Sequence, residues 1–126
     1  MRRYALPIIA ATVWISVSEF VRNQVLLIHF WTDHYSSLGL EFPSEPINGA
    51  IWGLWSLLLA VLIYVLLTQF SIKHTVVITW GAAFLLMWVV IGNMSVLPLG
   101  ILWFAVPLSL LEVYIAAVII RKLRYS

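Results

Sequence analysis

The sequence predicts an all-α integral membrane protein that folds as a bundle of four transmembrane helices. Hydrophobic residues make up 63% of the 126 residues and charged residues only 10%, whereas soluble domains are about half apolar and about a quarter charged. The mean hydropathy is +1.05. Because so few charges cannot cover a water-exposed surface, lipid must surround most of the exterior. The length predicts a single membrane domain over residues 1–126.

Four apolar segments are long enough to cross a hydrocarbon core of about 30 Å, which takes about 20 residues of helix. They are residues 5–31, 46–70, 74–96 and 98–121.

The first segment follows Met1-Arg2-Arg3, an opening that is also typical of signal peptides. Its apolar stretch continues to about Trp31, well beyond the roughly 7–15 residues of a signal sequence. We therefore expect a retained first helix. Residues 32–45 are predicted to form an acidic loop, with Ser44 capping the second helix and Pro46 in its first turn.

The basic residues predict the orientation. They lie before the first helix, between the second and third, and after the fourth: Arg2, Arg3, Lys73, Arg121, Lys122 and Arg124. The other two connections contain no Lys or Arg, so the positive-inside rule places both termini in the cytoplasm and the acidic loop outside. Interfacial aromatic belts are expected from Tyr4, Phe70 and Tyr125 at one end, and from Trp31, Tyr35 and Phe42 at the other. We expect the cytoplasmic (inner) membrane of a prokaryote.

A polar stripe runs along the first helix in the stretch "WISVSEFVRNQ". Ser16, Glu19 and Asn23 follow helical spacing on one face, and Arg22 lies beside them. This face is predicted to point into the bundle.

Small residues mark the faces where helices are expected to approach closely in lipid. The second helix begins with the G-x-x-x-G pattern of Gly49 and Gly53, and Glu112 stands near Ser109 among small residues of the fourth helix. The first, second and fourth helices are therefore predicted to meet along these faces.

Glu19 and Glu112 are each predicted within about one turn of the membrane midplane. A charged side chain costs at least about 2.5 kcal/mol at that depth, so intramembrane acids usually have a role. Two acids accompany one base, Arg22, which leaves one acid free to bind a proton or cation. Glu112 is our choice for that acid. The alternative is a structural ion pair that fixes helix register.

Further candidates surround these charges. Ser16, Ser109 and Asn23 would supply hydrogen bonds, and Trp14 and Trp88 would line a pocket. An aromatic cage beside an acid would suit an organic cation, whereas the alternative is that the tryptophans are packing residues.

His29, Asp33 and His34 near the acidic loop form a weaker candidate, a divalent metal site. A solvated acidic loop explains the same residues.

Other chemistries find no support in the sequence. There is no cysteine, which excludes disulfides and thiolate metal sites. The zinc-protease, serine-hydrolase and P-loop motifs are absent, so we lean against an enzyme and expect no cofactor. The basic residues gather at the ends of helices rather than in a stripe, which argues against nucleic-acid binding.

We therefore expect a small transporter or channel-like protein that handles a proton or cation at its intramembrane glutamates. The first alternative is a non-catalytic subunit or assembly factor whose polar cluster fixes helix packing. The second is a lipid-handling membrane enzyme, for which Glu19, Glu112 and His29 are the available groups. Expected partners are membrane lipids, further copies of the chain or a larger membrane complex, and a proton, cation or lipophilic small molecule.

Overall fold

The computed structural model describes residues 1–124, so Tyr125 lies outside the described part. All regular structure in residues 1–124 is helical. The elements are α1 (Arg2–Phe20), η1 (Val21–Leu26), α2 (Ile28–Ser37), α3 (Pro46–Leu67), α4 (Ile72–Trp80), η2 (Gly81–Leu85), α5 (Leu86–Asn93), η3 (Leu99–Ile101) and α6 (Leu102–Arg124). Here η1 and η2 are π-helical turns and η3 is a 3₁₀ turn.

These elements combine into four helical rods that are long and apolar enough to cross a membrane. They cover Arg2–Leu26, Pro46–Leu67, Ile72–Asn93 and Leu99–Arg124. This confirms the prediction of an all-helical chain with four helices of membrane-spanning length, and it indicates a membrane protein.

The first helix differs from the predicted span of 5–31. At η1 the chain widens into a π turn, in which Leu27 N–H donates to Arg22 O at 2.9 Å. Leu27 then leaves helical geometry, with φ −116° and ψ 12°, and α2 starts in a new direction at Ile28. The predicted loop 32–45 is therefore helical up to Ser37 and irregular only from Leu38 to Glu45.

The start of α3 also differs in detail from the prediction. The N-cap is Glu45 rather than Ser44, and its side chain accepts a hydrogen bond from the backbone of Asn48. In return, Asn48 Oδ1 accepts the Glu45 backbone N–H at 2.9 Å. This reciprocal capping box satisfies two donors that the helix itself cannot pair. Pro46 occupies the first turn as predicted.

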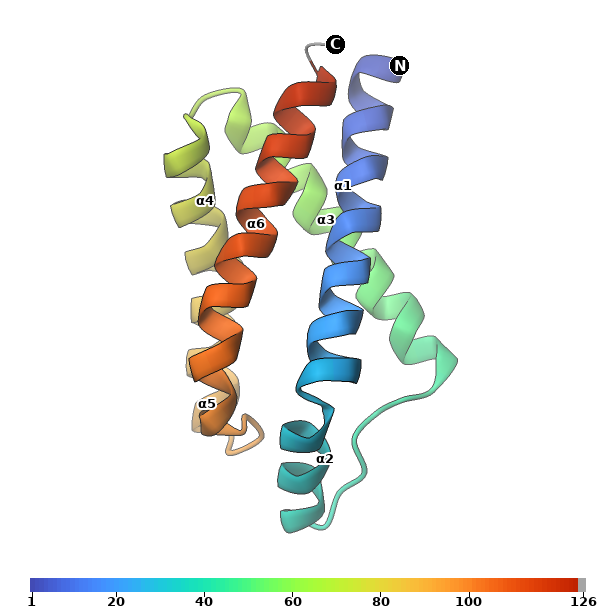
Figure 1. Cartoon of the computed structure of the whole chain (residues 1–126), viewed down its shortest axis with the longest axis vertical. Coiled ribbons are helices and arrows are strands. Elements are labelled where there is room, and N and C mark those ends of the chain that lie inside the picture. The colour runs from blue at the N-terminus through green and yellow to red at the C-terminus, as the bar shows by residue number, and fades with distance from the viewer. Residues whose placement is uncertain (125–126) are drawn as a thin grey trace.

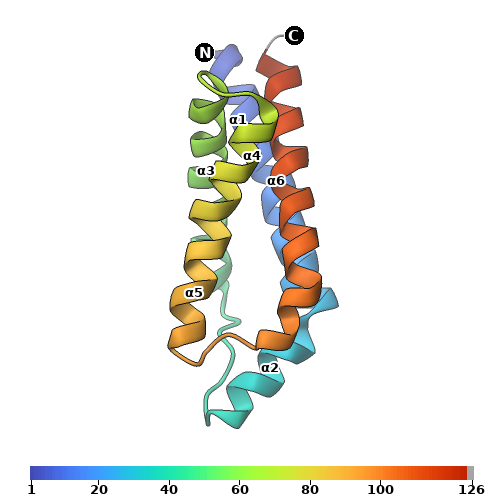
Figure 2. The same cartoon turned by 90° about the vertical axis from the view of Figure 1, so that its left-hand side faces the viewer.

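Both chain termini lie at one end of the bundle, with the turn that joins α3 to α4, while α2 lies at the opposite end (Figure 1). We call these the termini end and the α2 end. The rod formed by α4 and α5 runs beside α6 (Figure 2), and α1 packs against both α3 and α6.

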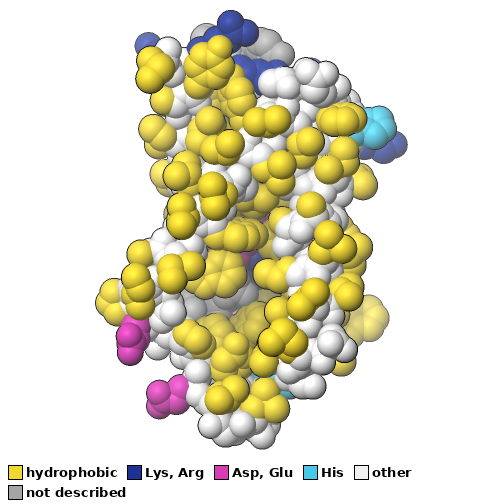
Figure 3. All heavy atoms as spheres, turned by 180° about the vertical axis from the view of Figure 1, so that it is seen from behind, with side chains coloured by type: hydrophobic (Ala, Val, Ile, Leu, Met, Phe, Trp, Pro, Cys, Tyr) yellow, Lys and Arg dark blue, Asp and Glu magenta, His cyan; other side chains and the backbone are white. Residues whose placement is uncertain are grey.

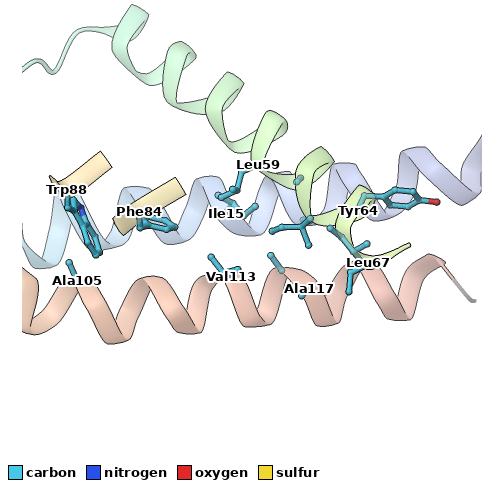
Figure 4. Close-up of a cluster of buried hydrophobic side chains, with 14 of the residues drawn as sticks. Ile15, Leu59, Tyr64, Leu67, Phe84, Trp88, Ala105, Val113 and Ala117 are labelled. Atoms are coloured by element: carbon cyan, nitrogen blue, oxygen red, sulfur yellow. The ribbon is translucent and has the colours of Figure 1, made fainter. Parts of the chain in front are cut away.

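The helices meet around a core of aliphatic side chains and alanines (Figure 4). Ile15 of α1, Ile63 of α3 and Val113 of α6 are completely buried there. Ala60 and Ala116 are also fully buried, which fits the prediction that small residues let α1, α3 and α6 approach closely.

Gly49 and Gly53 do not follow that prediction. A Cβ atom added at either glycine would have no heavy atom within 4 Å, apart from its own helix surroundings. The buried residues of α3 all lie between Ser56 and Leu67, so the stretch that holds Gly49 and Gly53 buries no side chain. Figure 1 shows the reason: α3 leans away from α1 and α6 toward the α2 end.

Candidate functional site

Three charged side chains meet inside the bundle, where α1 and η1 face α6. Arg22 Nη2 lies 2.6 Å from Glu19 Oε1, and Arg22 Nη1 lies 3.4 Å from Glu112 Oε1. Glu19 and Arg22 are each 5% exposed and Glu112 is 1% exposed. The guanidinium therefore bridges two carboxylates that belong to different helices and are shielded from the surroundings.

Glu19 is the more completely paired acid. Its second oxygen, Oε2, accepts a hydrogen bond of 3.0 Å from Asn23 Nδ2, and the Asn23 amide also donates to the Glu19 backbone carbonyl at 3.1 Å. Trp31 of α2 donates its indole N–H to Asn23 Oδ1 at 3.1 Å. A continuous hydrogen-bonded chain thus joins Arg22, Glu19, Asn23 and Trp31.

Glu112 is held more loosely. Its contact with Arg22 is 0.8 Å longer than that of Glu19, the difference between 3.4 Å and 2.6 Å. Its second oxygen, Oε2, is buried and has no hydrogen-bond partner among residues 1–124. Its backbone carbonyl accepts the indole N–H of Trp14 at 2.9 Å. When both acids are ionised, the three side chains carry one net negative charge.

The two π turns meet at this cluster. Arg22 belongs to η1 and Phe84 to η2, and the guanidinium carbon lies 5.3 Å from the centre of the Phe84 ring. The completely buried ring therefore offers Arg22 a cation–π contact in addition to its two carboxylates. π turns are frequent at functional sites.

A cavity of about 710 Å³ opens beside the cluster. Glu19, Arg22, Asn23 and Ser16 contribute to its lining from α1 and η1, whereas Glu112 is not part of it. Figure 3 shows the bundle hollowed, with acidic and basic side chains visible in the depth of an otherwise hydrophobic surface.

The cavity walls are aromatic and aliphatic and come from separate parts of the chain. Its aromatic lining consists of Phe20, Trp31, Tyr35, Phe42, Trp52, Phe84 and Trp88. Trp31 stacks on Phe42 at 5.5 Å between ring centres, and Tyr35 meets Phe42 edge-on at 5.2 Å. These contacts tie α2 to the loop before α3 at the α2 end of the cavity.

The predicted site residues thus fall into two groups. Glu19, Arg22, Asn23, Ser16 and Trp88 line the cavity, and Glu112 sits behind Arg22.

Ser109 and Trp14 lie outside that lining. Ser109 Oγ accepts the Trp80 indole N–H at 2.9 Å and donates to Val106 O at 3.0 Å, so its hydrogen bonds support helix packing. Trp14 donates its indole N–H to the backbone carbonyl of Glu112.

The structure does not gather the residues of the predicted metal site into one cluster. No three His, Cys, Asp or Glu side chains within residues 1–124 come together in a way that could hold a metal ion. His34 Nε2 instead lies 2.7 Å from Ser95 O, which fastens α2 to the turn between α5 and η3. His29 and Asp33 share one face of α2, but neighbouring His34 points about 100° around the helix from Asp33.

Sequence reasoning missed two residues of the site. Trp31 was expected at a membrane interface, yet it hydrogen bonds to Asn23. Phe84 lies within an apolar stretch and has no polar neighbour in the sequence. Only the three-dimensional structure therefore reveals its contact with Arg22. Asn23 and Trp31 are eight residues apart, which is about 80° around a regular helix, so periodicity gave no signal for their contact.

Comparison with family models, with curated proteins and with solved structures finds no match. The function must therefore be argued from the site itself.

Proposed function

We propose that this protein is a small membrane transporter or channel-like protein that handles a proton or monovalent cation at Glu19, Arg22 and Glu112. One observation carries the proposal: two buried carboxylates share a single guanidinium, and one oxygen of Glu112 has no partner among the described residues. Charged groups placed among membrane helices usually mark ion pathways.

The geometry suggests how the cluster would work. A proton on Glu112 removes the net negative charge and weakens its contact with Arg22, so the guanidinium can rest fully on Glu19. Loss of that proton restores the bridge. Because Glu19 and Glu112 lie on different helices, each change of charge alters the attraction between α1 and α6.

The cavity supplies access to the cluster from the α2 end. Glu19, Arg22 and Asn23 lie along it, while the termini half of the bundle is filled by the core around Ile63 and Val113. With both termini in the cytoplasm, as the basic residues predict, the cavity belongs to the external half of the membrane. The structure would then be open outward and closed inward.

The non-catalytic subunit is a second candidate, because Arg22 clamps α1 to α6 and Trp14 adds a bond between the same two helices. In that case the cluster fixes packing and moves no ion. The lipid-handling enzyme gains no support: it calls for a groove between the first and last helices, where Ile15 and Val113 are fully buried.

The test is proton and potassium flux into proteoliposomes under an imposed gradient. We expect flux with the wild type and a loss of at least about tenfold with Glu112→Gln, which keeps the side-chain shape but cannot carry a proton. Glu41→Gln is the matched control, because Glu41 is an exposed acid outside the cavity.

Two results would count against transport. Absence of proton and potassium flux with the wild type would contradict the proposal. Flux that is equal in the wild type and in Glu112→Gln, together with weaker association of α1 and α6 in the mutant, would favour the subunit reading.

A further inference from the structure

We infer that the cavity binds a membrane-dissolved organic cation, an apolar molecule that carries one amine or quaternary ammonium group, and admits it sideways between α3 and α5. This inference rests on the proposed function and names the substrate class of the same site.

The size and walls of the cavity fit such a molecule. Pockets for drug-sized ligands occupy about 300–1,000 Å³ and are mostly apolar with a few polar groups, and this cavity measures about 710 Å³. Its rings include Trp31, Trp52 and Trp88, and aromatic faces attract cations by their quadrupole. An apolar body would replace lipid or water against these walls.

The charges along the cavity favour a cation over an anion. Glu19 and Glu45 belong to the described lining, and Glu112 lies just behind it, whereas Arg22 is the single basic residue of that lining. The guanidinium is already engaged by two carboxylates and by the Phe84 ring. An anion would have to displace these partners, while a cation can share Glu19 as Arg22 moves toward the unpaired oxygen of Glu112.

The opening of the cavity points toward the side of the bundle. Gly49 and Gly53 line it from α3, and Met87 and Ile91 line it from α5. The first half of α3, up to Trp55, holds no buried residue, and Trp55 at its end meets Phe84 of η2 edge-on, 5.6 Å between ring centres. Figure 3 shows a hydrophobic rim around the hollow, which would face lipid in a membrane. A lipophilic cation partitioned into the bilayer would therefore reach the site without crossing water.

The glycines allow a clean test. A Cβ atom added at Gly53, which lines the cavity, would meet no heavy atom within 4 Å, so we expect Gly53→Leu to fill part of the cavity without displacing the backbone. A Cβ atom added at Gly81 would also meet no heavy atom within 4 Å, but Gly81 does not line the cavity, so Gly81→Leu is the matched control. Gly49→Leu serves as a second filling variant if Gly53→Leu folds poorly.

The measurement is equilibrium binding by calorimetry to the protein in lipid nanodiscs, with empty nanodiscs subtracted. The probes are tetraphenylphosphonium and tetraphenylborate, which share size and shape but carry opposite charges. We expect the phosphonium to bind at least about tenfold more tightly than the borate. Gly53→Leu and Glu19→Gln should each weaken phosphonium binding by about tenfold or more, and Gly81→Leu should leave it unchanged.

Several results would overturn the inference. They are equal binding of both probes, no binding of either, or full binding by both filling variants. A fourth is a lower particle mass of Gly53→Leu in light scattering, because a second copy of the chain would then occupy the opening.

Failure of the inference and failure of the proposed function remain distinguishable. Proton flux that requires Glu112, without phosphonium binding, keeps the proposed function and rejects the substrate class. Phosphonium binding that Gly53→Leu abolishes, without any flux, keeps the binding site and rejects transport.

Discussion

Removing Arg22 is expected to cost more stability than removing either acid. Arg22→Met takes away the cation that bridges Glu19 at 2.6 Å and Glu112 at 3.4 Å, with both acids at most 5% exposed. Breaking a buried ion pair by removing one partner costs about 3–5 kcal/mol, since a buried charge is left uncompensated. Two acids lose their partner here, so we expect the free energy of unfolding to fall by about 4 kcal/mol.

Two further variants separate charge from packing. Glu112→Gln keeps an oxygen that can accept the longer contact from Arg22 and replaces one carboxylate oxygen by a neutral amide nitrogen, so its cost should stay below about 1 kcal/mol. The triple variant, Arg22→Met with Glu19→Gln and Glu112→Gln, carries no buried charge in the cluster. Because neutral replacement of a buried ion cluster is often well tolerated, the triple variant should recover most of the stability lost by Arg22→Met.

The assay is reversible unfolding in mixed micelles of dodecyl maltoside and SDS, followed by the fluorescence of the seven tryptophans. A loss of less than about 1 kcal/mol for Arg22→Met would refute the reasoning, because such a value is typical of exposed ion pairs. A triple variant no more stable than Arg22→Met would refute it as well, since packing rather than charge would then dominate.

Three other predictions concern the rest of the bundle. Thr79 has a buried hydroxyl without a hydrogen-bond partner among residues 1–124, so Thr79→Val should leave the unfolding free energy unchanged or raise it by up to about 1 kcal/mol in the same micelle assay. Ser109→Ala should lower it by about 1 kcal/mol, because the Trp80 indole N–H loses its 2.9 Å acceptor. Single cysteines at Glu41 and Lys73 of this cysteine-free chain should react with an impermeant maleimide from opposite sides of the membrane, and labelling from one side would contradict the predicted orientation.

The four helical rods could be predicted from the sequence because hydropathy and length are local properties. An apolar stretch of about 20 residues has few stable forms in lipid other than a helix. The ends of the rods were less predictable. The break at Leu27 falls inside the short apolar run Val25 to Ile28, and no Pro or Gly marks it.

The face of the polar residues on the first helix also follows from periodicity, and the structure brings Glu19 and Arg22 to one buried cluster. The partner on α6 could be predicted from membrane depth alone, because Glu112 and Glu19 were both placed within about one turn of the membrane midplane. What periodicity could not supply is the π turn at Val21–Leu26. The extra residue in that turn changes where Asn23 and Arg22 point, and it depends on contacts with other helices.

The G-x-x-x-G pattern shows a limit of prediction from the sequence alone. Gly49 and Gly53 were interpreted as a packing face, because close helix contact replaces the hydrophobic drive in lipid. That argument requires a partner helix, and α3 diverges from its neighbours where the glycines lie. A glycine face that borders a cavity has a different use, because any larger side chain would reduce the space beside Glu19. Larger side chains at Gly49 and Gly53 therefore distinguish a packing role from a ligand role. If the glycines form a packing face, a larger side chain would separate copies of the chain. If they border a ligand site, it would exclude an organic cation.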